Sequence, residues 1–333
     1  MRRLNHNWPC TAPGVLLAAT LACGLASRAQ DLPAPLIAAN GDLQAGKADD
    51  ATAKLNDFLK SDAKSAPANN LLCRVEYALQ HFDPAADHCQ KAVDADPQNA
   101  RYHLWLGRAL GERASKAQFL SAFSLAKRAR SEFETAVKLD PKDADALGDL
   151  GEFYAEAPGA VGGGTDKAEG IAAKLDAVDP ARGHQFRASL AEKKNDYTAA
   201  EREYKAATET GSHFAFAWMA LASYDRRRQR FDDMEAAVKS GEAAVARDKH
   251  AAVALFNGGS ALERANRDPA TAVRLLEAYL ASPDKTEEAP AFEALVKLAR
   301  LHKSMNDGAA AQKDKAAALA LAHDYKPAQE LKF

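Results

Sequence analysis

Apolar residues recur along most of this chain at the spacing of an amphipathic helix. In residues 196–212 they stand three and four positions apart, and large and small ones alternate: Tyr197, Ala200, Tyr204 and Ala207. That spacing places all four on one face of a helix. A half-buried strand would need apolar residues at every second position, and no such stretch stands out. The pattern predicts a chain of short amphipathic helices.

The same arrangement returns elsewhere, which indicates an internal repeat. Residues 128–141 repeat the alternation, with Ala129, Phe133 and Ala136 at matching offsets. A second pattern, L-x2-L-G-x2-Y, follows at residues 147–154. Two helical patterns that alternate in this way predict a series of helical pairs.

Together the two patterns resemble the paired helices of the tetratricopeptide repeat, whose first helix has the frame W-x2-L-G-x2-Y. Trp218 and Leu221 reproduce most of that frame, with Ala222 in place of glycine. Small residues let two antiparallel helices approach closely, and large ones fill the seam toward the next pair. Prolines such as Pro97 and Pro141 mark helix ends at intervals near the roughly 34 residues of the family.

The resemblance implies an all-α fold, a right-handed α-solenoid of about eight antiparallel helical hairpins within residues 30–333. The hairpins are expected at about residues 35–66, 67–97, 98–141, 142–180, 181–211, 212–248, 249–283 and 285–324, the last as a cap. Residues 102–168 resemble, more narrowly, a subgroup of secreted bacterial tetratricopeptide proteins through YHLWLGRALGE, FLSAFSLAKRAR and APGAVGGG. A generic helical bundle is the alternative.

Two hairpins are longer than the repeat expects. Gly107 and Ala129 are 22 residues apart instead of about 12, so extra residues within 111–127 should lengthen both helices of the third hairpin. Gly151 and Ala168 are 17 residues apart, which leaves a smaller insertion in the fourth hairpin.

This second insertion is a loop rich in glycine, whose defining residues are Pro158, Gly159, Gly162, Gly163 and Gly164. A phosphate-binding G-x4-G-K-[S/T] loop needs lysine where Thr165 stands and a hydroxyl where Asp166 stands, and it follows a strand. We therefore expect a widened turn, with Thr165 or Asp166 capping the next helix. A small-ligand binder or enzyme accessory that uses this loop is an alternative function.

The N-terminal residues have the pattern of a secretory signal peptide. MRR precedes an apolar run at residues 15–26, which is too short to span a bilayer, and small residues lead to a cleavage site after Ala29. A lipoprotein anchored at Cys23 is the weaker alternative. Cleavage removes three arginines, so the formal net charge changes from −2 to −5. This mixed, mildly acidic chain is expected in the periplasm or outside the cell, with no nucleic acid as partner and no membrane span.

Cys73 and Cys89 are the cysteines that remain after cleavage. The turn expected at residues 81–84 lies almost midway between them, so antiparallel helices would bring them side by side. We expect a disulfide, since the compartment is oxidising, and it would support an end of the solenoid that has one packing neighbour fewer. Two buried thiols are one alternative. A metal site with His81 and His88 is another, but its spacing matches no common zinc pattern.

The sequence carries no recognisable catalytic motif. The nine histidines are scattered, and neither G-x-S-x-G nor H-E-x-x-H occurs. The dense basic run at residues 226–230 is bracketed by Asp225 and Asp232, so a solvated turn is the better interpretation than an anion site. We expect no enzyme activity, no cofactor and no metal.

In tetratricopeptide proteins the first helix of each hairpin lines a concave groove, so the resemblance implies a partner-binding site there. The positions carried over are Arg101, Leu104, Arg108, Glu152, Gln185, Phe216, Met219 and Arg226. Arginines mixed with apolar anchors suit an extended peptide or a partner helix. The lysine and asparagine pattern of the carboxylate-clamp subgroup is missing. We expect a non-catalytic protein–protein interaction scaffold of the bacterial envelope; an assembly factor for an outer-membrane complex is a further alternative.

Overall fold

The computed structural model describes residues 32–211, 213–248 and 250–332, which contain α-helices, one 3-10 turn and no strand. The elements are α1 (Ala34–Gln44), α2 (Ala48–Ser61), α3 (Ala66–Ala78), α4 (Phe82–Ala95), α5 (Ala100–Lys116), α6 (Phe119–Leu139), α7 (Ala144–Glu156), η1 (Gly159–Val161), α8 (Thr165–Val178), α9 (Pro180–Lys193), α10 (Tyr197–Glu209), α11 (Phe214–Arg227), α12 (Phe231–Val245), α13 (Ala252–Ala265), α14 (Pro269–Ala281), α15 (Ala291–Ser304), α16 (Gly308–Leu321) and α17 (Lys326–Gln329). Among these residues no helix is long and apolar enough to cross a membrane. The signal peptide, its cleavage site after Ala29 and the lipoprotein cysteine Cys23 lie outside the described residues.

The helices pair into eight antiparallel hairpins, α1–α2 through α15–α16, which confirms the predicted all-α, right-handed solenoid. Short polar residues start many of the helices, where an aspartate side chain accepts a hydrogen bond from a first-turn N–H: Asp143, Asp179, Asp196, Asp268 and Asp307. The tight turns within hairpins use residues with positive φ, among them Gln80, Asn195, Gln229 and Asn306. The third hairpin carries the predicted lengthening, since α5 and α6 have 17 and 21 residues.

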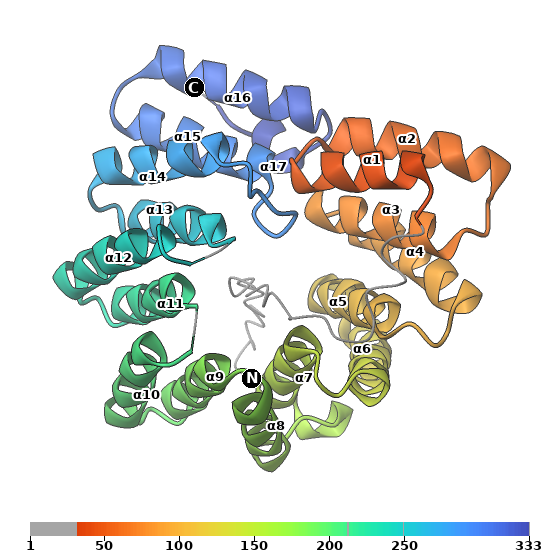
Figure 1. Ribbon diagram of the computed structural model, residues 1–333, viewed down its shortest axis with the longest axis horizontal. Coiled ribbons are helices and arrows are strands. Elements are labelled where there is room, and N and C mark those ends of the chain that lie inside the picture. Colours follow the sequence, from red (N-terminus) through yellow and green to blue (C-terminus); the bar gives the residue numbers. More distant parts are fainter. Residues whose placement is uncertain (1–31, 212, 249, 333) are drawn as a thin grey trace.

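The eight hairpins form a closed ring (Figure 1), in which odd-numbered helices line the inside and even-numbered helices form the outer layer. The last hairpin packs on the first two, so one apolar cluster contains Leu36 and Leu43 of α1 together with Phe292 and Val296 of α15 and Tyr325. The rings of Phe292 and Tyr325 lie 4.7 Å apart between centroids. The expectation that the first hairpin has one packing neighbour fewer is therefore wrong.

Polar contacts also cross this seam between the two ends of the chain. The carboxylate of Glu287, in the loop at residues 282–290, accepts hydrogen bonds from Arg74 Nε at 2.9 Å and from Gln44 Nε2 at 2.8 Å. A second guanidinium nitrogen of Arg74 completes a bidentate ion pair. His323 bonds Asp49 through its ring and through its backbone N–H. Residues more than 200 positions apart thus close the ring.

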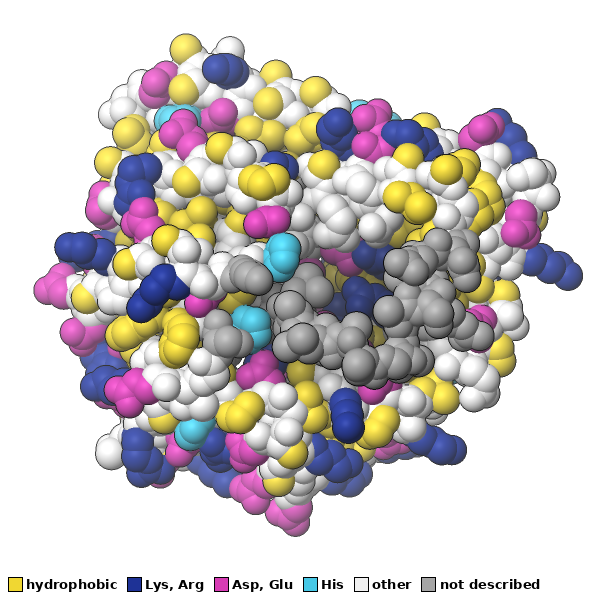
Figure 2. Space-filling view, viewed as in Figure 1, with side chains coloured by type: hydrophobic (Ala, Val, Ile, Leu, Met, Phe, Trp, Pro, Cys, Tyr) yellow, Lys and Arg dark blue, Asp and Glu magenta, His cyan; other side chains and the backbone are white. Residues whose placement is uncertain are grey.

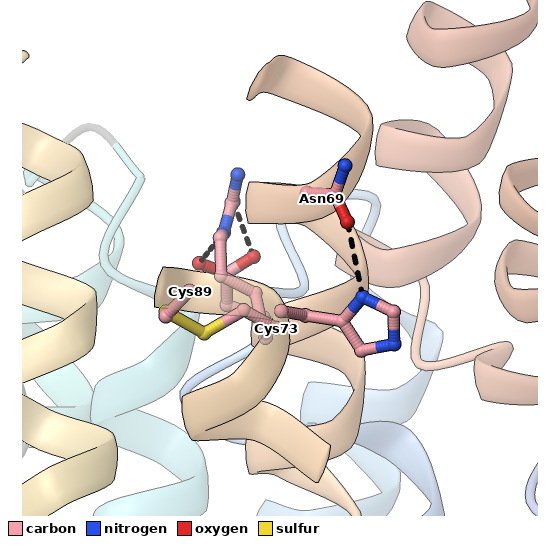
Figure 3. Close-up of a disulfide and its surroundings, with 6 residues drawn as sticks. Asn69, Cys73 and Cys89 are labelled. Carbon is pink, nitrogen blue, oxygen red and sulfur yellow. Dashed lines mark hydrogen bonds and ion pairs between the residues drawn. A yellow bond between two sulfur atoms is a disulfide. The ribbon is translucent and has the colours of Figure 1, made fainter. Parts of the chain in front are cut away.

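Cys73 of α3 and Cys89 of α4 form a disulfide, with their Cα atoms 5.2 Å apart and both side chains fully buried (Figure 3). Beside the disulfide, Nδ1 of His88 lies 3.2 Å from the side-chain oxygen of Asn69, which is the dashed contact at Asn69 in the same figure. Burial lowers the pKa of His88, with Lys91 adding to the effect. His88 is thus engaged by Asn69, and the two cysteines by each other.

Candidate partner-binding surface

The inner wall of the ring is polar where α5, α7 and α9 meet. Arg108 of α5 pairs with Asp149 of α7, and Arg182 Nη2 of α9 lies 2.7 Å from Asp145 Oδ1 of α7. Arg108 also covers the ring of Trp105, with its guanidinium carbon 4.7 Å from the centroid. All four charged side chains are largely withdrawn from water, so the pairs fix the three helices relative to one another.

Two further carboxyl groups face this region without an ion pair among the described residues. Burial raises the pKa of Glu288, in the loop at residues 282–290, to about 8; Arg108 opposes the shift, and Glu287 reinforces it. Glu152 of α7 is an exposed side chain; the partial loss of solvent beside its neighbours raises its pKa to about 7, and the charges of Asp149 and Glu156 reinforce the shift. Glu288 therefore holds a proton near neutral pH, whereas Glu152 remains in contact with solvent.

Several inner-helix side chains keep polar atoms that are shielded from water and have no hydrogen-bond partner among the described residues. They are Asn70 Nδ2 of α3, Arg108 Nη2 of α5, Gln185 Nε2 of α9 and Ser260 Oγ of α13. All four belong to the first helices of their hairpins, which line the inside of the ring. Buried donors without acceptors are rare in folded proteins, so each of them calls for an explanation.

The apolar side chains that were expected to anchor a partner in the groove lie in the protein core instead. Leu104, Phe216 and Met219 are 2%, 5% and 3% exposed, so they offer a partner almost no surface. The methyl group of Met219 fills space left by Gly241 and Gly258, where any Cβ would lie within about 3 Å of it. The expectation of apolar anchors therefore needs correction: neighbouring hairpins pack so tightly in the ring that these side chains become core.

The remaining expected groove residues are two arginines. Arg101 is exposed at the start of α5. Arg226 of α11 is half-buried; burial lowers its pKa, and the nearby charge of Arg264 adds to the effect. Neither forms an ion pair within the described residues.

The rest of the basic run at residues 226–230 is used within the protein. Arg227 binds Glu192, and Arg230 binds Glu201 and Asp225. The guanidinium carbon of Arg228 lies 3.5 Å from the ring centroid of Tyr197. The run is thus a salt-bridged turn rather than a merely solvated one.

The glycine-rich loop is packed against α6. Arg130 Nη1 donates to the carbonyl of Val161 at 3.1 Å, and Gly162 has φ +100° with the guanidinium where a Cβ would lie. A Cβ on Gly163 would lie 1.8 Å from the carbonyl oxygen of Ala157. Gly159 and Gly164 have open space instead. Glycine is thus required at position 162 by its positive φ and the nearby guanidinium, and at position 163 by the close approach of the Ala157 carbonyl.

The polar groups of this loop are engaged internally. The N–H groups of Gly162, Gly163 and Gly164 donate to Gly159, Pro158 and Tyr154 at 2.9, 3.2 and 2.8 Å. Lys167 Nζ donates to the carbonyl of Gly162 at 2.8 Å. Gly164 is the N-cap of α8 and no side chain caps that helix, so the expected cap by Thr165 or Asp166 is wrong. A loop whose amides already have carbonyl partners is poorly prepared to cradle phosphate.

Sequence reasoning missed several inner-wall residues: Asp145, Asp149, Arg182, Glu287 and Glu288. Asp145 and Arg182 stand at the first-helix position that Arg101 occupies in α5, so extending the repeat register to α7 and α9 would have found them. Glu287 and Glu288 lie in an irregular loop, where no repeat position predicts them.

On the face drawn in Figure 2, acidic and basic side chains are interspersed over the outer helices, so neither sign dominates that view. This mixture agrees with the formal net charge of −2 for the whole chain.

Comparison with known proteins supports the fold of this chain and does not identify its function. No protein-family model matches the chain, and no curated protein matches it. The solved structure of yeast Tom70 is similar with a TM-score of 0.53 and 14% identity, over 85% of this chain and 57% of that one. TTC0263, described as a thermophilic TPR protein of Thermus thermophilus, is similar with a TM-score of 0.47 and 20% identity, over 60% of this chain and 96% of that one. The likeness to Tom70 establishes a solenoid of the tetratricopeptide type.

Proposed function

We propose that this protein is a non-catalytic scaffold that binds an extended segment of a partner protein inside its ring. The observation that carries this proposal is the polar inner wall of the ring, on which Arg101 and Glu152 are exposed and form no ion pair among the described residues. A carbonyl of an extended segment accepts hydrogen bonds from a guanidinium such as that of Arg101, and an N–H group of the segment donates to a carboxylate oxygen such as that of Glu152.

Three histidines form contacts that are structural rather than catalytic, because each pairs with a carboxylate of the neighbouring helix. Within single hairpins, His103 Nδ1 lies 2.6 Å from Glu132, His184 Nδ1 lies 2.8 Å from Glu203, and His302 Nδ1 lies 2.7 Å from Asp314; in each case the second residue belongs to the returning helix. These pairs tie helices together at three separate places around the ring. The internal engagement of the glycine-rich loop removes the support for a small ligand there.

A location in the bacterial envelope is part of the same proposal. Disulfides such as Cys73–Cys89 form and persist in oxidising compartments, and the N-terminal sequence has the pattern of a signal peptide. Intact-mass measurement of the exported protein should give Gln30 as the first residue; an uncleaved Met1 or a diacylated Cys23 would contradict the expected processing.

Site-specific photocrosslinking in the native envelope tests the binding site. Ser189 is exposed on α9, one turn from Gln185 and on the same helix face, whereas Lys174 is exposed on the outer helix α8. A crosslinker at Ser189 should capture the partner, and the same crosslinker at Lys174 should not. Arg101→Glu should weaken the capture, and Lys174→Glu should leave it unchanged. A partner captured only from position 174 would show that the outer surface is the binding face.

A further inference from the structure

Closure of the ring brings together three side chains that the sequence holds far apart. Asp49 lies in the first turn of α2, and His323 and Asp324 lie in the turn between α16 and α17. One ligand atom from each, a ring nitrogen and two carboxylate oxygens, lie within 4.8 Å of one another. The cluster therefore exists only because the last hairpin packs on the first.

The contact between Asp49 and His323 is well formed. His323 Nδ1 lies 2.9 Å from one carboxylate oxygen of Asp49, and the backbone N–H of His323 donates to the other at 3.0 Å. A simple ion pair accounts for these two residues.

The Asp49–His323 contact does not engage Asp324. This second carboxylate lies near that of Asp49, where like charges repel; its side chain is 42% exposed, and its Oδ1 has no hydrogen-bond partner among the described residues. Its Oδ2 lies 3.9 Å from Nδ1 of His81, at the turn between α3 and α4. His81 is itself oriented by Glu76 at 2.9 Å. His81 therefore lies beside Asp324, at the edge of the cluster formed by Asp49, His323 and Asp324.

We propose that Asp49, His323 and Asp324 bind a divalent transition-metal ion such as Zn²⁺, which ties the ends of the chain together and holds the ring closed. One imidazole nitrogen and two carboxylate oxygens are ligands that zinc accepts, and an imidazole disfavours Mg²⁺ and Ca²⁺, which prefer oxygen. Two negative charges around the site offset the charge of the ion. His81 stands near Asp324 as an orienting neighbour.

The structural consequence follows from where the ligands lie. Asp49 belongs to the first hairpin, and His323 and Asp324 belong to the last. An ion that binds the closed ring more tightly than the open chain stabilises the closed form by mass action. The metal ion would therefore link the first hairpin to the last one, which the polypeptide backbone does not connect directly.

Zinc titration of the mature, full-length protein tests this proposal. By calorimetry, Zn²⁺ should bind with one ion per chain at this site and raise the Tm, while Mg²⁺ should do neither. Asp324→Asn and His323→Gln should each weaken zinc binding at least about 10-fold, since even neighbours of metal ligands contribute that much.

The matched control is His250→Gln. His250 is an exposed histidine that faces one aspartate, Asp284, at 3.4 Å, and the described residues supply no third ligand there. This variant should bind zinc as the wild type does. Asp324→Asn is isosteric, and circular dichroism verifies its fold. If neither seam variant changed zinc affinity, or if His250→Gln reduced it equally, the proposed site would be wrong.

Discussion

The guanidinium of Arg74 on α3 forms a bidentate ion pair with Glu287, which follows it by 213 residues. The two side chains are 11% and 6% exposed, so the pair lies almost out of water. It joins the second hairpin to the loop before the last one, and the helices between them complete the circle (Figure 1). This contact, together with the apolar cluster beside it, makes the solenoid a ring.

Breaking this pair should destabilise the protein strongly. Glu287→Ala leaves the charge of Arg74 buried without its partner, which costs about 3–5 kcal/mol. Urea unfolding followed by circular dichroism measures the loss. The control is Asp57→Ala, which removes an exposed pair with Lys60 and should change stability by no more than about 1 kcal/mol. Similar losses in both variants would mean that the seam contact contributes little.

The disulfide should be present in the native protein and contribute to its stability. Peptide mapping without reductant should recover Cys73 linked to Cys89. The bond closes a loop with a sequence separation of 16, so its removal in Cys73→Ser/Cys89→Ser should cost about 3 kcal/mol on the entropic model. Native material in which both thiols react with an alkylating reagent would refute the bond.

The glycine-rich loop should tolerate alanine at one glycine and not at another. Gly163→Ala places a methyl group against the carbonyl oxygen of Ala157 and should lower stability by about 1–3 kcal/mol. Gly159→Ala meets open space and should be neutral within about 1 kcal/mol. Thermal unfolding separates the two. A nucleotide that raised the Tm of the wild type, but not of Gly163→Ala, would revive the phosphate-binding alternative.

The core position of Met219 should be visible in mutant stability. Met219→Ala leaves a cavity among α11, α12 and α13 and should cost about 2–5 kcal/mol. Arg101→Glu, on the exposed start of α5, should change stability by about 0.5 kcal/mol or less. If Met219→Ala unfolded at the same urea concentration as the wild type, the packing of neighbouring hairpins would be looser than the structure has it.

Ionisation of Glu288 should lower the stability of the protein as the pH rises above about 4.5. Its folded-state pKa of about 8 lies above the ordinary 4.5, so the folded protein holds a proton that the unfolded chain has lost. The contribution of Glu288 to the unfolding free energy therefore decreases from about pH 4.5 to about pH 8 and then levels off.

Glu288→Gln should flatten this dependence and raise the Tm at pH 8 relative to the wild type. Glu277→Gln, an exposed change on the outer helix α14, is the control and should leave the profile unchanged. Parallel profiles for wild type and Glu288→Gln would show that Glu288 ionises as readily in the folded protein as in the unfolded chain.

The sequence by itself determined everything that depends on local spacing. Intervals of three and four residues around Tyr197, Ala200 and Tyr204 specify amphipathic helices, and their repetition specifies hairpins that stack on their neighbours. The near-equal distances of Cys73 and Cys89 from their turn placed them side by side. The residues at Thr165 and Asp166 argued against a phosphate loop. Each of these inferences needs only one helix, one turn or one pair of adjacent helices.

Only the tertiary structure decided that the solenoid closes. Each hairpin is rotated slightly relative to the one before it, and the repeat pattern does not specify that rotation closely enough to sum it over eight hairpins. The partners of Arg74 and Asp49 therefore came from more than 200 residues away, where no spacing points to them. Packing between adjacent hairpins made Met219 part of the core, and closure brought Glu288 to face the charges of the inner helices. Local pattern determines which faces are apolar; the accumulated curvature determines which of those faces meet.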